Sequence, residues 1–349
     1  MLTSWKKTLC ALGLSCLPLF GSAATTSTPY TLANPAHAPV ILDQHYHHQH
    51  SGWMVGLHLM TMTMSGLRDG SNDVSTTAAL DMSGPYAFMM APKFMRMDMA
   101  MLHVMYMPSM NSSVMLMIPY VAKRMESVDM AGNTGSTRSE GLGDMVLSYG
   151  SWFHAGEHNH THVQLGLGLP TGKINATDDT LMSGGTQVAL PYAMQLGSGS
   201  FSLQPRADYT HQFNRRVSAG GGLNAIWYMN RNYRAYRLGN HYAADAWVGY
   251  HWIPALSNRF ILTASHQDRI HGADPDLAGM ATMMPTANVT SYRQDQLLGS
   301  VEIGFIGRHG RVAGHHLVAD VGYPLYQRTG AVAMKSRLQA NLQWTYSFM

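Results

Sequence analysis

The sequence predicts an all-β fold, a transmembrane up-and-down antiparallel β-barrel of about twelve strands that occupies residues 51–349. Three observations predict it. Apolar side chains recur at every second position through most of the chain, which is the period of a strand with two distinct faces. The alternating runs are roughly ten residues long, enough for a tilted strand to cross a membrane. Short connections alternate with long ones, as they do in outer-membrane barrels. A soluble all-β sandwich with one wet face is the competing fold.

The first 24 residues have the three parts of a secretory signal peptide. Two lysines precede an apolar core from Leu9 to Phe20, and small residues follow at Gly21–Ala24. The apolar core is too short to span a bilayer as a helix. Both cysteines of the chain, Cys10 and Cys16, lie inside this segment. We therefore expect the exported chain to have neither a disulfide bond nor thiolate chemistry.

The first three predicted strands carry methionine and histidine on one face. In the first strand Trp53, Val55, Leu57 and Leu59 share the opposite face, which must point to lipid in a membrane barrel. The predicted lumen face of the three strands consists of Met54, His58, Met60, Met62 and Met64, then Met97, Met99, Met101, His103 and Met105, then Met115 and Met117. Short connections favour adjacent positions for these strands in the sheet. We therefore expect one continuous patch on the inner wall.

The later strands repeat the alternation with ordinary polar partners. Clear examples run from Val163 to Leu169, from Phe201 to Tyr209 and from Leu338 to Phe348. Further candidates lie near Leu142–Trp152, Val217–Met229, Tyr242–Trp252, Arg259–Gln267, Gln294–Ile306 and Val312–Tyr323. Long loops are expected near Ser65–Pro92, Met125–Glu140, Thr171–Gly199, Asn230–His241, Ile270–Tyr292 and Pro324–Arg337. An even number of strands places both ends of the barrel on the periplasmic side.

Aromatic residues stand near the ends of several predicted strands, among them Trp53, Trp152 and Trp344. Such positions fit the aromatic girdles of membrane barrels. Together with the signal peptide, they predict a protein of the cell outer membrane in a Gram-negative-type bacterium.

The sequence gives little support to two classes of function, nucleic-acid binding and catalysis. Charged residues make up 12% of the chain, the net charge is +3, and no sustained basic stripe indicates a nucleic-acid partner. For catalysis, Ser265 and His266 are adjacent, so on a strand they face opposite ways. We expect a protein that is not an enzyme and whose partners are outer-membrane lipids and either a metal ion or a small apolar molecule.

Two glycine-rich segments carry a resemblance to a known family. Ser139–Asp144 has the sequence SEGLGD, and Gly166–Gly172 has the sequence GLGLPTG. Their glycines suit tight strand ends where backbones approach closely. In these motifs, and in strand patterning over most of the chain, the sequence resembles the phenol MetA-degradation family of outer-membrane proteins, also described as transporters. The resemblance implies a barrel and, for some members, uptake of aromatic compounds. No individual functional residue carries over.

The predicted methionine and histidine patch has a chemistry of its own. Thioether sulfur and imidazole nitrogen are soft or borderline ligands that suit Cu(I), Ag(I) or Cu(II). The patch therefore predicts an outer-membrane channel or binding barrel that handles copper or another soft metal. Two alternatives stay open, since methionine can also line a channel for small hydrophobic or aromatic compounds, or fill a crowded lumen as adaptable packing. No cofactor is required, and copper, as Cu(I), is the candidate.

A second set of histidines is predicted outside the barrel wall. His45, His47, His48 and His50 lie in residues 25–50, a predicted periplasmic tail, and His154, His158, His160 and His162 lie in the predicted link between the fourth and fifth strands. Both segments are expected on the periplasmic side, where they could meet. Clustered imidazoles bind Cu(II), Zn or Ni. A protein that sequesters metal there without transporting it is a third hypothesis, and a solvated tail and turn explain the same residues without metal.

Overall fold

The computed structural model describes residues 52–109, 111–154 and 158–348 of the chain. The predicted signal peptide lies outside the described residues. So does the predicted histidine-rich tail with His45, His47, His48 and His50. The hypotheses on these segments stay predictions.

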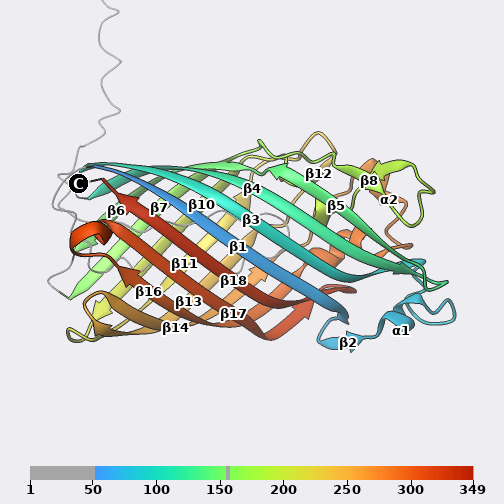
Figure 1. Cartoon of the computed structure of the whole chain (residues 1–349). Helices are drawn as coiled ribbons and strands as arrows, with labels where there is room; N and C mark the ends of the chain where they lie inside the picture. Colours follow the sequence, from blue (N-terminus) through green and yellow to red (C-terminus); the bar gives the residue numbers. More distant parts are fainter. Residues whose placement is uncertain (1–51, 110, 155–157, 349) are drawn as a thin grey trace, which may run out of the picture.

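The described residues form a closed antiparallel barrel of twelve strands (Figure 1). The wall consists of β1 (Gly52–Asp69), β3 (Met90–Ser109), β4 (Ser112–Asp129), β6 (Met145–His154), β7 (Asn159–Leu169), β10 (Ser202–Gln212), β11 (Val217–Tyr228), β13 (His241–Ile253), β14 (Leu256–Gln267), β16 (Gln294–Ile306), β17 (His315–Thr329) and β18 (Ala333–Ser347). Each wall strand pairs with the next along the chain, and β18 pairs with β1 to close the sheet. The predicted fold and strand number are confirmed.

The two ends of the barrel differ. Met54 of β1 lies opposite Ser347 of β18, so the first strand begins where the last one ends. We call this the short-turn end, and it also holds η4 (Gly310–Val312). The long connections gather at the other end, the loop end (Figure 1). They contain β2 (Asn72–Val74), α1 (Thr76–Leu80), β8 (Thr177–Asp179), β9 (Gln187–Ala189), η1 (Tyr192–Met194), β12 (Tyr236–Arg237), β15 (His271–Gly272), α2 (Pro275–Ala278), η2 (Pro285–Ala287) and η3 (Val289–Tyr292).

Side chains alternate between an exposed outer face and a buried inner face, because successive residues of a strand point to opposite sides. On β1, Leu57 and Leu59 are 39% and 42% exposed, whereas His58 and Met60 are 0% and 3% exposed. The outer face is thus apolar, as the hydrocarbon of a bilayer requires. In the described ranges no helix is long and apolar enough to cross a membrane.

Two separate strands, β5 (Thr134–Leu142) and β6, share the position next to β4 in the sheet. β5 pairs with the loop-end half of β4, and β6 pairs with its short-turn half. The predicted long loop at Met125–Glu140 is therefore wrong, since β4 and β5 continue through it as a hairpin. The reason is the polar sequence of β5, whose serines, threonines and charged residues do not mark an apolar face. The predicted loop at Pro324–Arg337 is wrong in the same way, because β17 and β18 continue into it.

An apolar cluster holds the loop-end segments together. Tyr192, Tyr236, Leu238, Ile270, Leu277, Met284 and Ala287 pack there with Met90, Ile226 and Tyr228 of the barrel strands. The loops consequently pack together as a cap with its own apolar core.

Candidate functional site

The predicted methionine patch is present and is larger than predicted. β1, β3 and β4 are adjacent, with Met60 opposite Met99 and His103 opposite Met117. We call this surface the methionine wall, and it consists of Met54, His58, Met60, Met62, Met64, Met95, Met97, Met99, Met101, His103, Met105, Met107, Met115, Met117 and Met125. All of these side chains are buried except Met64, which is half-buried. Met125 lies beyond the predicted strand, but the alternation could have been followed to it.

The connection between β7 and β10, residues 170–201, packs on the loop-end half of this wall. We call it the inward loop. Its residue Leu196 shares a buried cluster with the middle of the wall, and Leu190 and Met194 share one with its loop end. The wall methionines are Met60, Met62, Met97, Met99 and Met101 in the first cluster, and Met95 and Met125 in the second. In this half, methionine acts as adaptable packing, which was one of the sequence hypotheses.

Lys123 of β4 ties the inward loop to the wall. Its ammonium group donates hydrogen bonds to the carbonyl oxygens of Ala193, at 2.9 Å, and Gln195, at 2.6 Å. Ser139 of β5 donates to the carbonyl oxygen of Met194 at 2.5 Å. A buried ammonium group is stable only when such partners replace water. The loop is thus fastened by charge-assisted hydrogen bonds as well as by apolar contacts.

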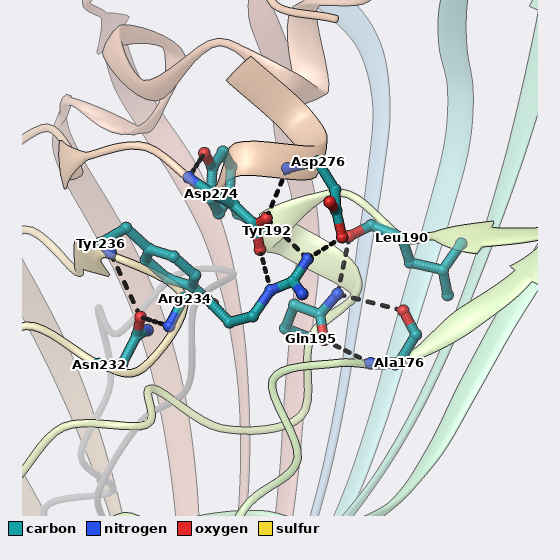
Figure 2. A network of polar contacts seen from close by, with 9 residues as sticks. All are labelled: Ala176, Leu190, Tyr192, Gln195, Asn232, Arg234, Tyr236, Asp274 and Asp276. Carbon is teal, nitrogen blue, oxygen red and sulfur yellow. Dashed lines mark hydrogen bonds and ion pairs between the residues drawn. The ribbon is translucent and has the colours of Figure 1, made fainter. Parts of the chain in front are cut away.

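Polar contacts also shape the inward loop itself (Figure 2). The Gln195 side chain accepts a hydrogen bond from the backbone N–H of Ala176 at 2.9 Å and donates one to the carbonyl oxygen of Leu190 at 2.7 Å. The Tyr192 hydroxyl accepts from the backbone N–H of Asp274 at 2.9 Å. The bond between Tyr192 and Asp274 joins the inward loop to the segment that precedes α2.

Arg234 extends this network to a third loop (Figure 2). Its guanidinium donates to both carboxylate oxygens of Asp274, at 2.8 and 2.7 Å, and to Asp276. The hydrogen bonds that Arg234 donates to these two carboxylates raise its pKa further above the ordinary value. Asn232 accepts from the backbone N–H groups of Arg234 and Tyr236, which closes the turn. The cap is therefore internally cross-linked.

The short-turn half of the wall has different neighbours. Met54, Met105, Met107, Met115 and Met117 form a buried cluster there with Val146 and Trp152 of β6. The Trp152 ring stacks on His162 of β7, with ring centroids 4.3 Å apart. Nδ1 of His162 lies 3.5 Å from the carboxylate of Asp208. The prediction that Trp152 belongs to the outer aromatic girdle is wrong, because its side chain is buried in the lumen.

The structure corrects the position of the second histidine set. His160 and His162 belong to β7, and His162 is buried inside the barrel instead of lying outside its wall. His158 is exposed in the turn before β7. The strand starts earlier than predicted, because its first residues are polar and lack an apolar face. In the described part of the chain, no three His, Cys, Asp or Glu side chains converge as a metal site.

His58 and His103 lie between the two halves of the methionine wall. Their ring centroids are 6.2 Å apart and their planes meet at 74°. Nε2 of His58 lies 3.2 Å from Oδ1 of Asn341, whose amide nitrogen donates to Asp320 at 2.9 Å. Within the described residues, Nδ1 of His58 and both ring nitrogens of His103 have no hydrogen-bond partner. Buried polar atoms in this state are uncommon and call for an explanation.

The remaining strands line the lumen with polar and charged side chains. We call this surface the polar wall, and it includes Arg206, Asp208, Asp245, Arg259, Thr263, Gln296, Glu302, Asp320, Gln339, Asn341 and Gln343. Arg259 donates to Glu302 at 2.9 Å, and both side chains are almost fully buried. Arg206 pairs with Asp208 at 2.5 Å. The lumen therefore has one thioether-rich side and one side with paired charges.

Two small cavities at the loop end share Met125 in their lining. One of about 70 Å³ is lined by Met90, Met125, Leu181, Met182, Met280 and Met284, among others, and one of about 60 Å³ by Met64, Met95, Met125, Tyr292 and Met334, among others. A cavity that binds benzene measures about 150 Å³. Either cavity must therefore widen before it admits an aromatic ring, and flexible methionine side chains allow such a change.

The two glycine-rich motifs meet where β5 ends and β6 begins. Asp144 accepts a hydrogen bond from the backbone N–H of Gly172 at 2.9 Å, and others from the N–H and hydroxyl of Ser198 at 2.7 and 2.6 Å. Gly172 leaves no room for a side chain, since a Cβ there would stand 2.7 Å from the Cα of Gly197. The motifs thus fasten the inward loop at the junction of β5 and β6.

The closed barrel, its apolar outer face and its capped loop end define an outer-membrane β-barrel protein of the Gram-negative type. The chain belongs to the family described as "Putative MetA-pathway of phenol degradation", which matches residues 100–278. The resemblance found in the sequence is confirmed. No curated protein matches the chain at the level of sequence.

Solved structures share the fold. The COG4313 outer membrane channel from Pseudomonas putida F1 is similar with a TM-score of 0.60 and 16% identity, over 86% of this chain and 96% of that chain. A Pseudomonas aeruginosa FadL homologue is more remote, with a TM-score of 0.43 and 9% identity over 85% of this chain and 91% of that chain. The CymD monoaromatic hydrocarbon channel has a TM-score of 0.39 and 10% identity over 85% of this chain and 88% of that chain. At 16% identity the likeness to the Pseudomonas putida channel concerns the fold alone.

Proposed function

We propose that the protein is an outer-membrane channel for small apolar or aromatic molecules. The observation that carries the proposal is the methionine wall, which runs along β1, β3 and β4 from the cavities beside Met125 to the cluster beside Trp152. Membership of a family whose description names phenol degradation supports an aromatic substrate. The similar Pseudomonas putida structure is described as a channel, which supports passage rather than catalysis.

The chemistry of the two walls suits such a substrate. Thioether sulfurs contact aromatic rings favourably, but each contact contributes only about 0.3–1.5 kcal/mol. A row of weak and similar contacts lets a ring move from one methionine to the next without tight capture. The polar wall offers Gln339 and Gln343 to a substrate hydroxyl. A phenol would therefore place its ring on the methionine wall and its oxygen toward the polar wall.

Met125 is the first residue that such a molecule must displace. It belongs to the lining of both loop-end cavities, and it packs with Leu190 and Met194 of the inward loop. A rotation of this unbranched side chain would join the two cavities. Entry is therefore expected to depend on the size and charge of residue 125 more than on any other position of the cap.

A channel or binding barrel that handles copper or another soft metal was the leading sequence hypothesis, and neither the family nor the similar structures support it. The sequestering hypothesis depends on tail histidines outside the described residues, and it stays a prediction. The channel for apolar molecules was the alternative hypothesis, and the comparisons favour it.

The test is the initial rate of phenol or toluene uptake by cells that express the protein, compared with cells that lack it. Met125→Arg is expected to lower the gain in uptake several-fold, because it places a charge between the two apolar cavities. Met130→Arg is the matched control, since Met130 is exposed in the turn after β4. Equal amounts of each barrel in the outer membrane must be verified by heat-modifiable gel migration. An expressed parent protein that does not raise uptake would refute the proposed function.

A further inference from the structure

The passage of apolar molecules does not explain His58 and His103. Both rings are buried, at 0% and 2% exposure, in the middle of the methionine wall. Leucine would pack there without leaving polar atoms unpaired. Within the described residues three of the four ring nitrogens have no partner, which is unfavourable for the fold unless a ligand occupies them.

The hydrogen bonds behind His58 determine which of its nitrogens is available. A carboxylate only accepts hydrogen bonds, so the Asn341 amide nitrogen faces Asp320 and its oxygen faces His58. That oxygen must accept the proton of Nε2. Nδ1 of His58 is consequently unprotonated, and its lone pair has no hydrogen-bond partner among the described residues. Metal-binding histidines are commonly oriented in this manner, by a hydrogen bond from the ring nitrogen that does not bind the metal.

The spacing of the two rings fits a shared ion. Metal–nitrogen bonds are about 2 Å long and a ring nitrogen lies about 1 Å from the ring centre, so two imidazoles on one ion have centres about 5–6 Å apart. The centroids of His58 and His103 are 6.2 Å apart. A shift of either ring by less than about 1 Å would bring the two centroids to the separation expected for a shared ion.

Thioethers surround the pair in the register of the sheet. Met101 is directly opposite His58 on β3, and Met117 is directly opposite His103 on β4. Directly opposite residues have Cβ atoms about 4.5–5.5 Å apart, within reach of a long side chain. Met60 is a weaker candidate, because its sulfur already lies 3.9 Å from the Gln339 amide nitrogen that points to it.

We propose that His58, His103, Met101 and Met117 bind one soft monovalent metal ion, Cu(I) or Ag(I), on the methionine wall. The ligand set is neutral and includes thioethers, which favours a soft monovalent ion over Zn²⁺ or a hard cation. No group of three His, Cys, Asp or Glu residues in the described ranges offers a competing site. This site is separate from the cavities beside Met125, so it stands even if the proposed channel function fails.

The experiment measures Cu(I) binding to the full-length barrel in detergent under reducing conditions, by competition with a chromophoric Cu(I) chelator. All proteins carry H45Q, H47Q, H48Q and H50Q, which removes the four clustered histidines of the tail. The test variant is Met101→Leu with Met117→Leu. The control is Met62→Leu with Met97→Leu, a directly opposed pair on β1 and β3 that packs with Leu196. Both variants remove two sulfurs and nearly preserve volume.

We expect one Cu(I) per parent barrel, and an affinity loss in the test variant that exceeds the about 10–100-fold typical of outer-shell changes. The control should bind as the parent does. X-ray absorption of the loaded parent should show both nitrogen and sulfur ligands, which also decides the matter if a variant fails to assemble. A parent without bound Cu(I), a test variant that binds as tightly as the control, or a spectrum without sulfur would each overturn the proposal.

Discussion

The two walls of the lumen differ in the side chains that they bury: one buries charged and polar groups, and the other buries methionines. The polar wall contains several charges, and four of them form two ion pairs, Arg259 with Glu302 and Arg206 with Asp208. Beside the methionine wall, on the inner face of β4, lies the charged residue Lys123, whose partners are carbonyl oxygens of the inward loop. Rigid ion pairs therefore maintain one side of the barrel, and adaptable side chains line the other. A molecule moving through the lumen would find side chains held in place by ion pairs on the first side and side chains that can rotate on the second.

The largest expected effect follows from the polar wall. Arg259→Leu leaves the Glu302 carboxylate buried without its partner, and breaking a buried pair in this way costs about 3–5 kcal/mol. We expect the variant to unfold at a clearly lower urea concentration than the parent when both are reconstituted in lipid vesicles. Met97→Leu, on the methionine wall, is the comparison, since exchanging methionine for leucine costs less than about 1.5 kcal/mol. Similar losses for the two variants would mean that the walls do not differ as described.

A smaller effect is expected at Lys123, which lies beside the methionine wall. Lys123→Met removes the donor for the carbonyl oxygens of Ala193 and Gln195, and an unsatisfied buried acceptor costs about 1–3 kcal/mol. The inward loop should then be cleaved faster by added protease, while the barrel strands stay protected. Lys173→Met is the control, since Lys173 is an exposed residue of the same loop. Unchanged protection of the loop in Lys123→Met would show that its apolar contacts suffice.

Much of this contrast could be predicted from the sequence. The period-two alternation identified the lumen face of the first three strands, and the short connection between the second and third supported their adjacency. The alternation predicted which side chains face the lumen because lipid excludes polar groups from the outer face, so each strand has one permissible orientation. The chemistry of the methionine face was therefore visible before any contact was known.

The parts that could not be predicted depend on tertiary contacts. β5 has no apolar face, so nothing in its sequence distinguishes it from a loop until it pairs with β4. Trp152 and His162 lie near strand ends, where a girdle position and a lumen position look alike in sequence. The position of the inward loop against the barrel wall depends on hydrogen bonds of Lys123 and Asp144, whose partners are distant in the chain. Charged residues inside an alternating run or a glycine motif indicate such contacts without naming the partner.

The most direct test of the central claim is to locate an aromatic molecule in the lumen. Crystals of the barrel grown with 4-iodophenol would reveal the ligand by the anomalous scattering of its iodine. We predict iodine peaks along the methionine wall, beginning at the loop-end cavities with Met125 displaced. Iodine only on the outer apolar face, or only beside the ion pairs of the polar wall, would contradict the role assigned to the methionines.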